Sequence, residues 1–135
     1  MKRLPIFLAV LAVSTAVFGA DPVKTSVDDL IKNPAKFDGK VVKVEGVVDK
    51  YEERTSKKGN PYTVFKLKGK VNFVSVYMQS HPAKGKSPAD GAKVVVTGIF
   101  VKEKKLGNST YKNEIDASAD KKDPKAPRGI QVIKK

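Results

Sequence analysis

The chain has 135 residues, with 27 Lys or Arg against 14 Asp or Glu, which gives a formal net charge of +13. It has no Cys, which excludes a disulfide scaffold, thiol catalysis and thiolate metal sites. Its single His is too few for a His-rich metal site and argues against a catalytic triad. The hydrophobic share of 40% is too high for a chain that is disordered throughout. These values favour one small basic binding domain over an enzyme.

The first twenty residues have the three parts of a secretory signal peptide. Two basic residues, Lys2 and Arg3, precede an apolar run over 4–18, and the small residues Gly19 and Ala20 precede a polar segment. The run is shorter than the roughly 20 residues that span a bilayer, which favours a cleaved signal over the alternative, a signal anchor. We therefore expect residues 1–20 to direct the protein to the periplasm or outside the cell, with cleavage within 16–20 and a linker over 21–24.

One short helix and five strands are predicted after the linker. Ser26 and Asp29 have the spacing of a capping box, apolar residues at helical spacing follow, and Pro34 ends the helix. Asp28 and Asp29 are expected to complement the helix dipole rather than to bind a metal. The apolar period then changes to two, which predicts strands over 41–51, 62–68, 71–78, 93–101 and 111–117.

The alternation predicts which side chains of the second and third strands face the core. Those expected to point inward are Thr63, Phe65, Leu67, Val74, Val76 and Met78. Those expected on the opposite face are Tyr62, Val64, Lys66, Lys68, Phe73, Ser75 and Tyr77. A register error of one residue would exchange the two faces.

The connections carry turn residues. Loops are expected over 57–61, 69–70, 81–91 and 102–110, and the third of these is rich in Pro and Gly. The basic segment 119–135 is expected to be a flexible tail, with a short extra strand at Ile130, Val132 and Ile133 as the alternative.

Five short strands predict a small closed barrel, because closure removes exposed strand edges. Glycines at Gly46 and Gly98 mark points where the first and fourth strands are expected to bulge or coil sharply. The segments 46–67, 71–78 and 90–117 resemble a bacterial OB-fold domain, similar to the nucleic-acid-binding class related to tRNA-anticodon-binding domains and to its exported members. The expected fold is therefore all-β: a five-stranded OB-fold barrel over 25–118, with a short N-terminal helix and a flexible basic C-terminal tail.

Two features depart from relatives of that fold. Many OB domains carry a helix between the third and fourth strands, and here the Pro/Gly-rich segment 81–91 leaves room for a very short one at most. Exported haem chaperones with this fold attach haem through a His close to a Tyr near the end of the barrel. Neither the surroundings of Tyr111 nor the tail contains His, which argues against covalent haem carriage.

The resemblance implies a binding face on the second and third strands, flanked by the loops after the first and fourth. Aromatic rings on a sheet stack on bases, and neighbouring lysines neutralise phosphates. The candidate residues on the sheet are Tyr62, Lys66, Lys68, Phe73 and Tyr77. Those in the flanking loops are Arg54, Lys57 and Lys58, and Lys102, Lys104 and Lys105.

A purely structural interpretation of these residues remains as the alternative. Aromatic residues pair across strands, and scattered lysines form an ordinary soluble surface. Arginine, which reads phosphates with a bidentate fork, occurs after residue 20 at Arg54 and Arg128 alone. His81 is expected to be an ordinary loop residue, and the adjacent Glu52 and Glu53 are a poor acid/base pair.

The sequence thus predicts an exported, non-enzymatic OB-fold protein that binds single-stranded nucleic acid or another polyanion. No catalytic residue, metal site or cofactor is expected. The alternative is a periplasmic envelope or stress protein that binds a small molecule or a protein partner without a role on nucleic acid. The signal segment is expected to be removed, so no integral membrane protein is predicted.

Overall fold

The structure is a computed structural model that describes residues 22–123 and 126–134. The predicted signal peptide lies outside these residues. The described elements are β2 (Val23–Ser26), α2 (Val27–Lys32), α3 (Pro34–Phe37), β3 (Val41–Thr55), β4 (Pro61–Lys68), β5 (Phe73–Gln79), β6 (Lys93–Leu106), β7 (Ser109–Asp116) and β8 (Gly129–Lys134).

The predicted helix forms with the predicted cap. The Ser26 side chain accepts a hydrogen bond from the backbone N–H of Asp29 at 3.1 Å, which satisfies one of the first N–H groups of α2. Val27 and Leu30 are buried against the barrel. Pro34 ends α2 as expected, and it also opens the second short helix, α3, because proline at the first helical position needs no N–H partner.

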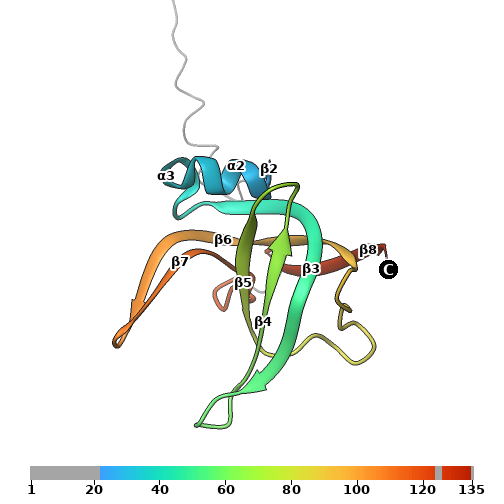
Figure 1. The fold of residues 1–135 in the computed structure, drawn as a ribbon. Helices are drawn as coiled ribbons and strands as arrows, with labels where there is room; N and C mark the ends of the chain where they lie inside the picture. Colours follow the sequence, from blue (N-terminus) through green and yellow to red (C-terminus); the bar gives the residue numbers. More distant parts are fainter. Residues whose placement is uncertain (1–21, 124–125, 135) are drawn as a thin grey trace, which may run out of the picture.

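Five strands close into the predicted barrel. β3 pairs with β4, β4 with β5, β5 with β7, β7 with β6, and β6 again with β3. The β5–β7 pairing is parallel, and the other pairings around the barrel are antiparallel. The fold is therefore an all-β OB-type barrel, with α2 and α3 at one end and two hairpins that leave the barrel in different directions (Figure 1).

The inward and outward faces of the strands are as predicted, and Met78, which was expected inward, is half-buried and packs against the core. Thr63, Phe65 and Leu67 of β4 are buried, as are Val74 and Val76 of β5. Each outward side chain of these two strands is exposed or half-buried. The core they form also contains Val42, Val44, Val48, Val94, Val96, Phe100 and Ile115.

Two strands that lie outside the barrel extend the sheet. β2 runs parallel to the first half of β3, and β8 runs antiparallel to the first half of β6. The linker expected over 21–24 is therefore strand at Val23 and Lys24. The prediction of a flexible tail is wrong for Gly129–Lys134, and the alternative, an extra strand at this point, is confirmed. The physical reason is that β3 and β6 pair with each other only along their first halves, and along their second halves β3 pairs with β4 and β6 with β7. Each first half therefore has a second edge with unpaired backbone groups, which β2 pairs on β3 and β8 pairs on β6.

The two internal glycines permit close strand contacts. A methyl group at Gly46 would lie 2.7 Å from the carbonyl oxygen of Lys68, and one at Gly98 would lie 2.7 Å from the carbonyl carbon of Asp116. The irregularity in β3 falls between Asp49 and Glu52 rather than at Gly46.

The basic loops predicted after the first and fourth strands are largely strand. β3 continues to Thr55, so Arg54 lies on a strand. β6 continues to Leu106 and β7 begins at Ser109, so the predicted loop over 102–110 is a hairpin with a two-residue turn. Lys102, Lys104 and Lys105 therefore lie on β6, and their positions follow the strand pairing. The connection over 81–91 contains turns and no helix.

Candidate nucleic-acid interface

Two tyrosines predicted for the binding face stack on one another across neighbouring strands. Tyr62 of β4 and Tyr77 of β5 have ring centroids 6.1 Å apart and an interplanar angle of 30°. Tyr77 lies opposite Val64, two residues from Tyr62, so the rings meet along the diagonal of the sheet. Both side chains are half-buried. Part of each ring therefore remains accessible on the outer face of the sheet.

A third aromatic ring on the same face of β5 carries a lysine. Phe73 is 49% exposed, and the Nζ atom of Lys66 lies 4.4 Å from its ring centroid. Lys68 is the cross-strand partner of Phe73. The outward residues of β5, at two-residue spacing, connect this pair to Tyr77 and so form one continuous surface.

Lys104 links the sheet to the β6–β7 hairpin. Its Nζ atom lies 5.0 Å from the ring centroid of Tyr77 and 5.9 Å from that of Tyr111, and it donates a hydrogen bond to Glu114 at 2.8 Å. Tyr111 and Glu114 were not among the predicted site residues. The pairing of Lys104 with Tyr111 in the hairpin would have indicated Tyr111, had the segment been interpreted as strand. We call Tyr62, Tyr77, Lys104 and Tyr111 the tyrosine–lysine face.

The charge of Lys104 is balanced by two neighbouring acids, Glu114 and Asp116. Burial acts to lower its pKa, but the hydrogen bond from Lys104 to Glu114 and the negative charges of Glu114 and Asp116 outweigh burial and raise the pKa above its usual value. The Glu114 side chain is 10% exposed, so its carboxylate depends on this cation. Lys104 is thus fixed by an acid, which makes it a weaker phosphate ligand than the sequence predicts.

Arg54 is likewise paired. Its guanidinium donates to the carboxylate of Glu52 at 2.8 Å, two residues earlier on β3. This hydrogen bond, a contact with Tyr62 and the charge of Glu52 raise the pKa of Arg54. The guanidinium therefore lies beside the tyrosine–lysine face and is held on the carboxylate of Glu52.

The other predicted loop lysines lie on the two hairpins. Lys57 and Lys58 occupy the β3–β4 turn, which is closed by a hydrogen bond from the Ser56 N–H to the Asn60 carbonyl at 2.8 Å. Lys105 is exposed on β6. In the part of the chain that the structure describes, Lys57, Lys58, Lys66, Lys68 and Lys105 form no ion pair.

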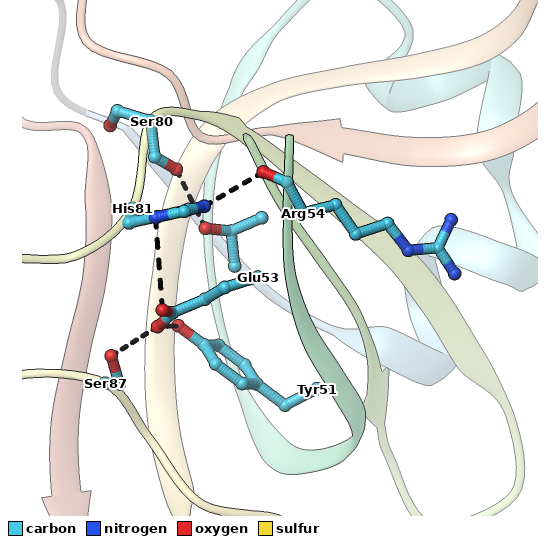
Figure 2. A network of polar contacts seen from close by, with 7 residues as sticks. Tyr51, Glu53, Arg54, Ser80, His81 and Ser87 are labelled. Atoms are coloured by element: carbon cyan, nitrogen blue, oxygen red, sulfur yellow. Dashed lines mark hydrogen bonds and ion pairs between the residues drawn. The ribbon is translucent and has the colours of Figure 1, made fainter. Parts of the chain in front are cut away.

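A polar network that the sequence did not indicate ties the 81–91 connection to β3 (Figure 2). The carboxylate of Glu53 accepts hydrogen bonds from the hydroxyl of Tyr51 at 2.8 Å and from the hydroxyl of Ser87. His81 Nδ1 lies 4.0 Å from Glu53, and Nε2 lies 2.9 Å from the carbonyl oxygen of Arg54, to which it donates. These partners come from positions far apart in the chain, which is why residue spacing did not reveal them.

The contacts of this network hold the 81–91 connection against β3. The hydrogen bonds from Ser87 and Tyr51 lower the pKa of Glu53, while burial raises the pKa of Tyr51 to about 12, with a further contribution from Glu53. Ser87 donates to the carboxylate rather than to the imidazole, and His81 is engaged with a backbone carbonyl. The groups therefore lack the arrangement of a nucleophile activated by a base.

Three further observations concern the described residues. No cluster of three or more His, Asp and Glu side chains among them is placed to hold a metal ion. No helix in the described ranges combines the length and apolar character that crossing a membrane requires. A cavity of about 860 Å³ lies between residues 85–92 and β8, and it contains none of the predicted site residues.

Comparisons with known proteins identify the fold and no family. No family model matches the chain, and no curated protein matches it. Among solved structures, yeast Stn1 and Ten1 align with a TM-score of 0.58 at 10% identity, over 93% of this chain and 70% of that one. A protein described as an aspartyl-tRNA synthetase from Leishmania major Friedlin aligns with a TM-score of 0.54 at 14% identity, over 98% of this chain and 23% of that one. At these identities the likeness shows the fold alone, and the chain spans about a quarter of the synthetase.

Proposed function

We propose that this protein is a non-enzymatic OB-fold module that binds single-stranded nucleic acid across the tyrosine–lysine face and the adjoining Lys66–Phe73 pair. The observation that carries the proposal is the row of partly accessible rings on neighbouring strands, with lysine ammonium groups held over Phe73 and Tyr77. Accessible rings offer stacking surfaces to bases, and stacking tolerates any base sequence.

The surrounding charge supports an anionic ligand. Lys66 and Lys68 flank the rings on β4, and Lys57, Lys58 and Lys105 lie on the two hairpins that project from the barrel. Since the ion pairs of Arg54 and Lys104 hold those cations on carboxylates, we assign the phosphate contacts to the five lysines rather than to Arg54 and Lys104. Binding would discriminate little between bases, because lysine is a point charge and stacking is sequence-tolerant.

One further observation supports the proposal, and another concerns the location of the protein. One structural neighbour is named as an enzyme that acts on tRNA, in keeping with nucleic acid as a ligand of this fold. The N-terminal sequence, with its basic start and apolar run, supports export, so the proposed site of action is the periplasm or the exterior of the cell.

The test is fluorescence anisotropy with a labelled single-stranded oligonucleotide at about 50 and 200 mM salt, with duplex DNA and heparin as competitors. If all five lysines contact phosphates, affinity falls about 100-fold between the two salt concentrations. Replacement of both Tyr62 and Tyr77 by Ala is expected to weaken binding at least tenfold, since stacking on an aromatic ring contributes about 1–3 kcal/mol per base.

The matched control is the variant Tyr62→Phe/Tyr77→Phe, which keeps both rings and removes only the hydroxyls. It should bind the oligonucleotide like the unaltered protein. An Ala variant that retains its circular dichroism spectrum and its affinity would remove the tyrosine–lysine face from the proposal. Equal displacement by heparin would reduce the site to a general polyanion surface.

A second candidate function is favoured by the cavity between residues 85–92 and β8. Its apolar lining residues, Pro88, Ala89, Ala92, Ile130 and Val132, suit a small apolar molecule. Absence of oligonucleotide binding at low salt, together with slower amide hydrogen exchange in β8 when a small molecule is added, would favour this function.

A further inference from the structure

The turn between β4 and β5 is held by a side chain of α2. The carboxylate of Asp28 accepts backbone hydrogen bonds from Lys70 at 3.0 Å, Val71 at 3.1 Å and Asn72 at 2.8 Å. The N–H of Gly69 also donates to the carbonyl of Asn72 at 2.8 Å. Three consecutive N–H groups therefore converge on one carboxylate, a contact that the dipole interpretation of Asp28 did not foresee. The turn has a fixed shape as a result.

This fixed turn presents apolar side chains to solvent. Val71 is 86% exposed and Phe73 is 49% exposed. Val47 of β3 is 38% exposed and is the cross-strand partner of Lys68, which in turn is the partner of Phe73. Val47, Lys68 and Phe73 therefore form a row on the outer face. An aliphatic side chain that is held outward by a rigid turn contributes little to the core and is suited to an external contact.

Three lysines lie next to these apolar side chains. Lys66 lies over the Phe73 ring, and Lys68 and Lys70 precede Val71 by three residues and by one. Among the described residues none of these three lysines forms an ion pair. The carboxylate of Asp28 is engaged by backbone N–H groups of the turn. The patch therefore combines a protruding apolar tip with a basic rim.

The β4–β5 turn that carries Val71 lies beside α2, whose Asp28 accepts its hydrogen bonds. Figure 1 shows β2, α2 and the β4–β5 turn at one end of the molecule. The patch therefore lies at the opposite end of the barrel from the β3–β4 hairpin (Figure 1).

We propose that this end of the barrel docks on the surface of an anionic lipid membrane, with Val71 and Phe73 in the interfacial region and Lys66, Lys68 and Lys70 at the headgroups. Apolar side chains with a basic rim provide the two contributions that interfacial binding requires, buried apolar area and attraction to anionic lipid. A nucleic acid explains the tip less well, because Val71 offers no ring on which a base can stack.

The absence of cysteine from the chain permits a site-specific test. The variant Val71→Cys, labelled with an environment-sensitive fluorophore on the chain from residue 21 onward, is mixed with vesicles of phosphatidylcholine containing 25% phosphatidylglycerol, or with pure phosphatidylcholine vesicles. The matched control is Asn108→Cys, labelled in the β6–β7 turn, which points away from α2 in Figure 1. Both variants lack the predicted signal segment, so the apolar run holds neither label at the vesicle surface.

The expected result is a blue shift of the label at position 71 on anionic vesicles, with little change at position 108. The added substitution Lys68→Gln/Lys70→Gln should lower the affinity for the anionic vesicles about 25-fold, about fivefold for each lysine. Equal responses of the two labels, equal responses on neutral vesicles, or no response would overturn the proposal. A shift that depends on protein concentration without vesicles would overturn it in favour of self-association. The variant Tyr62→Ala/Tyr77→Ala should leave the vesicle response intact, so this proposal and the proposed function fail separately.

Discussion

The Lys104–Glu114 pair offers the most direct test of how the barrel holds charge. The Nζ–Oε1 distance is 2.8 Å, and the side chains are 30% and 10% exposed. The substitution Lys104→Met removes the cation and leaves a nearly buried carboxylate uncompensated. Breaking a fully buried pair costs about 3–5 kcal/mol, and the partial exposure of Lys104 reduces this to about 2–3 kcal/mol.

For a domain of this size that loss corresponds to a fall in Tm of about 10 °C, measured by circular dichroism. The control is Lys105→Met, the exposed neighbour on β6, which should change the free energy of unfolding by less than about 0.5 kcal/mol. The double variant Lys104→Met/Glu114→Gln should recover most of the loss, because it removes both charges. Equal Tm values for the variants Lys104→Met and Lys105→Met would refute the reasoning.

The pH dependence of this pair has a defined sign. The pKa of Lys104 is raised in the folded state because the charges of Glu114 and Asp116 outweigh burial. The pair therefore contributes stability fully below the ordinary lysine pKa of about 10.4, and the contribution disappears as the pH rises through the higher folded-state pKa. The difference between the unaltered protein and Lys104→Met should accordingly persist across neutral pH.

Two further predictions concern close contacts in the fold. Gly98→Ala should destabilise the barrel by about 1–3 kcal/mol in urea unfolding, because its methyl group would lie 2.7 Å from backbone carbon of Asp116; an unchanged midpoint would contradict this contact. Asp28→Ala should loosen the β4–β5 turn and speed amide exchange at Asn72. The Asn72 N–H, followed by those of Val71 and Lys70, lowers the pKa of Asp28 against the effect of burial. The contribution of Asp28 to stability is therefore present above about pH 4, and it is lost as the pH falls through the folded-state pKa. A stability difference that instead grows towards low pH would exclude this role of Asp28.

Local pattern determined much of the fold and the sheet part of the candidate site. Apolar alternation placed Phe65 and Leu67 inside and Tyr62 and Lys66 outside, because side chains on a strand alternate between its faces whatever the strand pairs with. The cap at Ser26 followed for the same reason, since its hydrogen bond spans three residues.

The ends of the strands and the state of the charged site residues depended on tertiary structure. Nothing local showed that β6 continues to Leu106 or that Lys104 meets Glu114, because the hairpin that brings them together is fixed by strand pairing. The extra strand β8 forms because the first half of β6 has an edge to fill, which is a property of the closed barrel.

The sequence by itself thus determined the closed five-stranded barrel and the row of aromatic and lysine side chains on its outer face. Only the tertiary structure decided which cations are paired with acids, and that Asp28 holds the turn at Val71 although 43 positions separate them. The physical reason is range: alternation and capping act over two to four residues, whereas these contacts form only after the strands close around a common core.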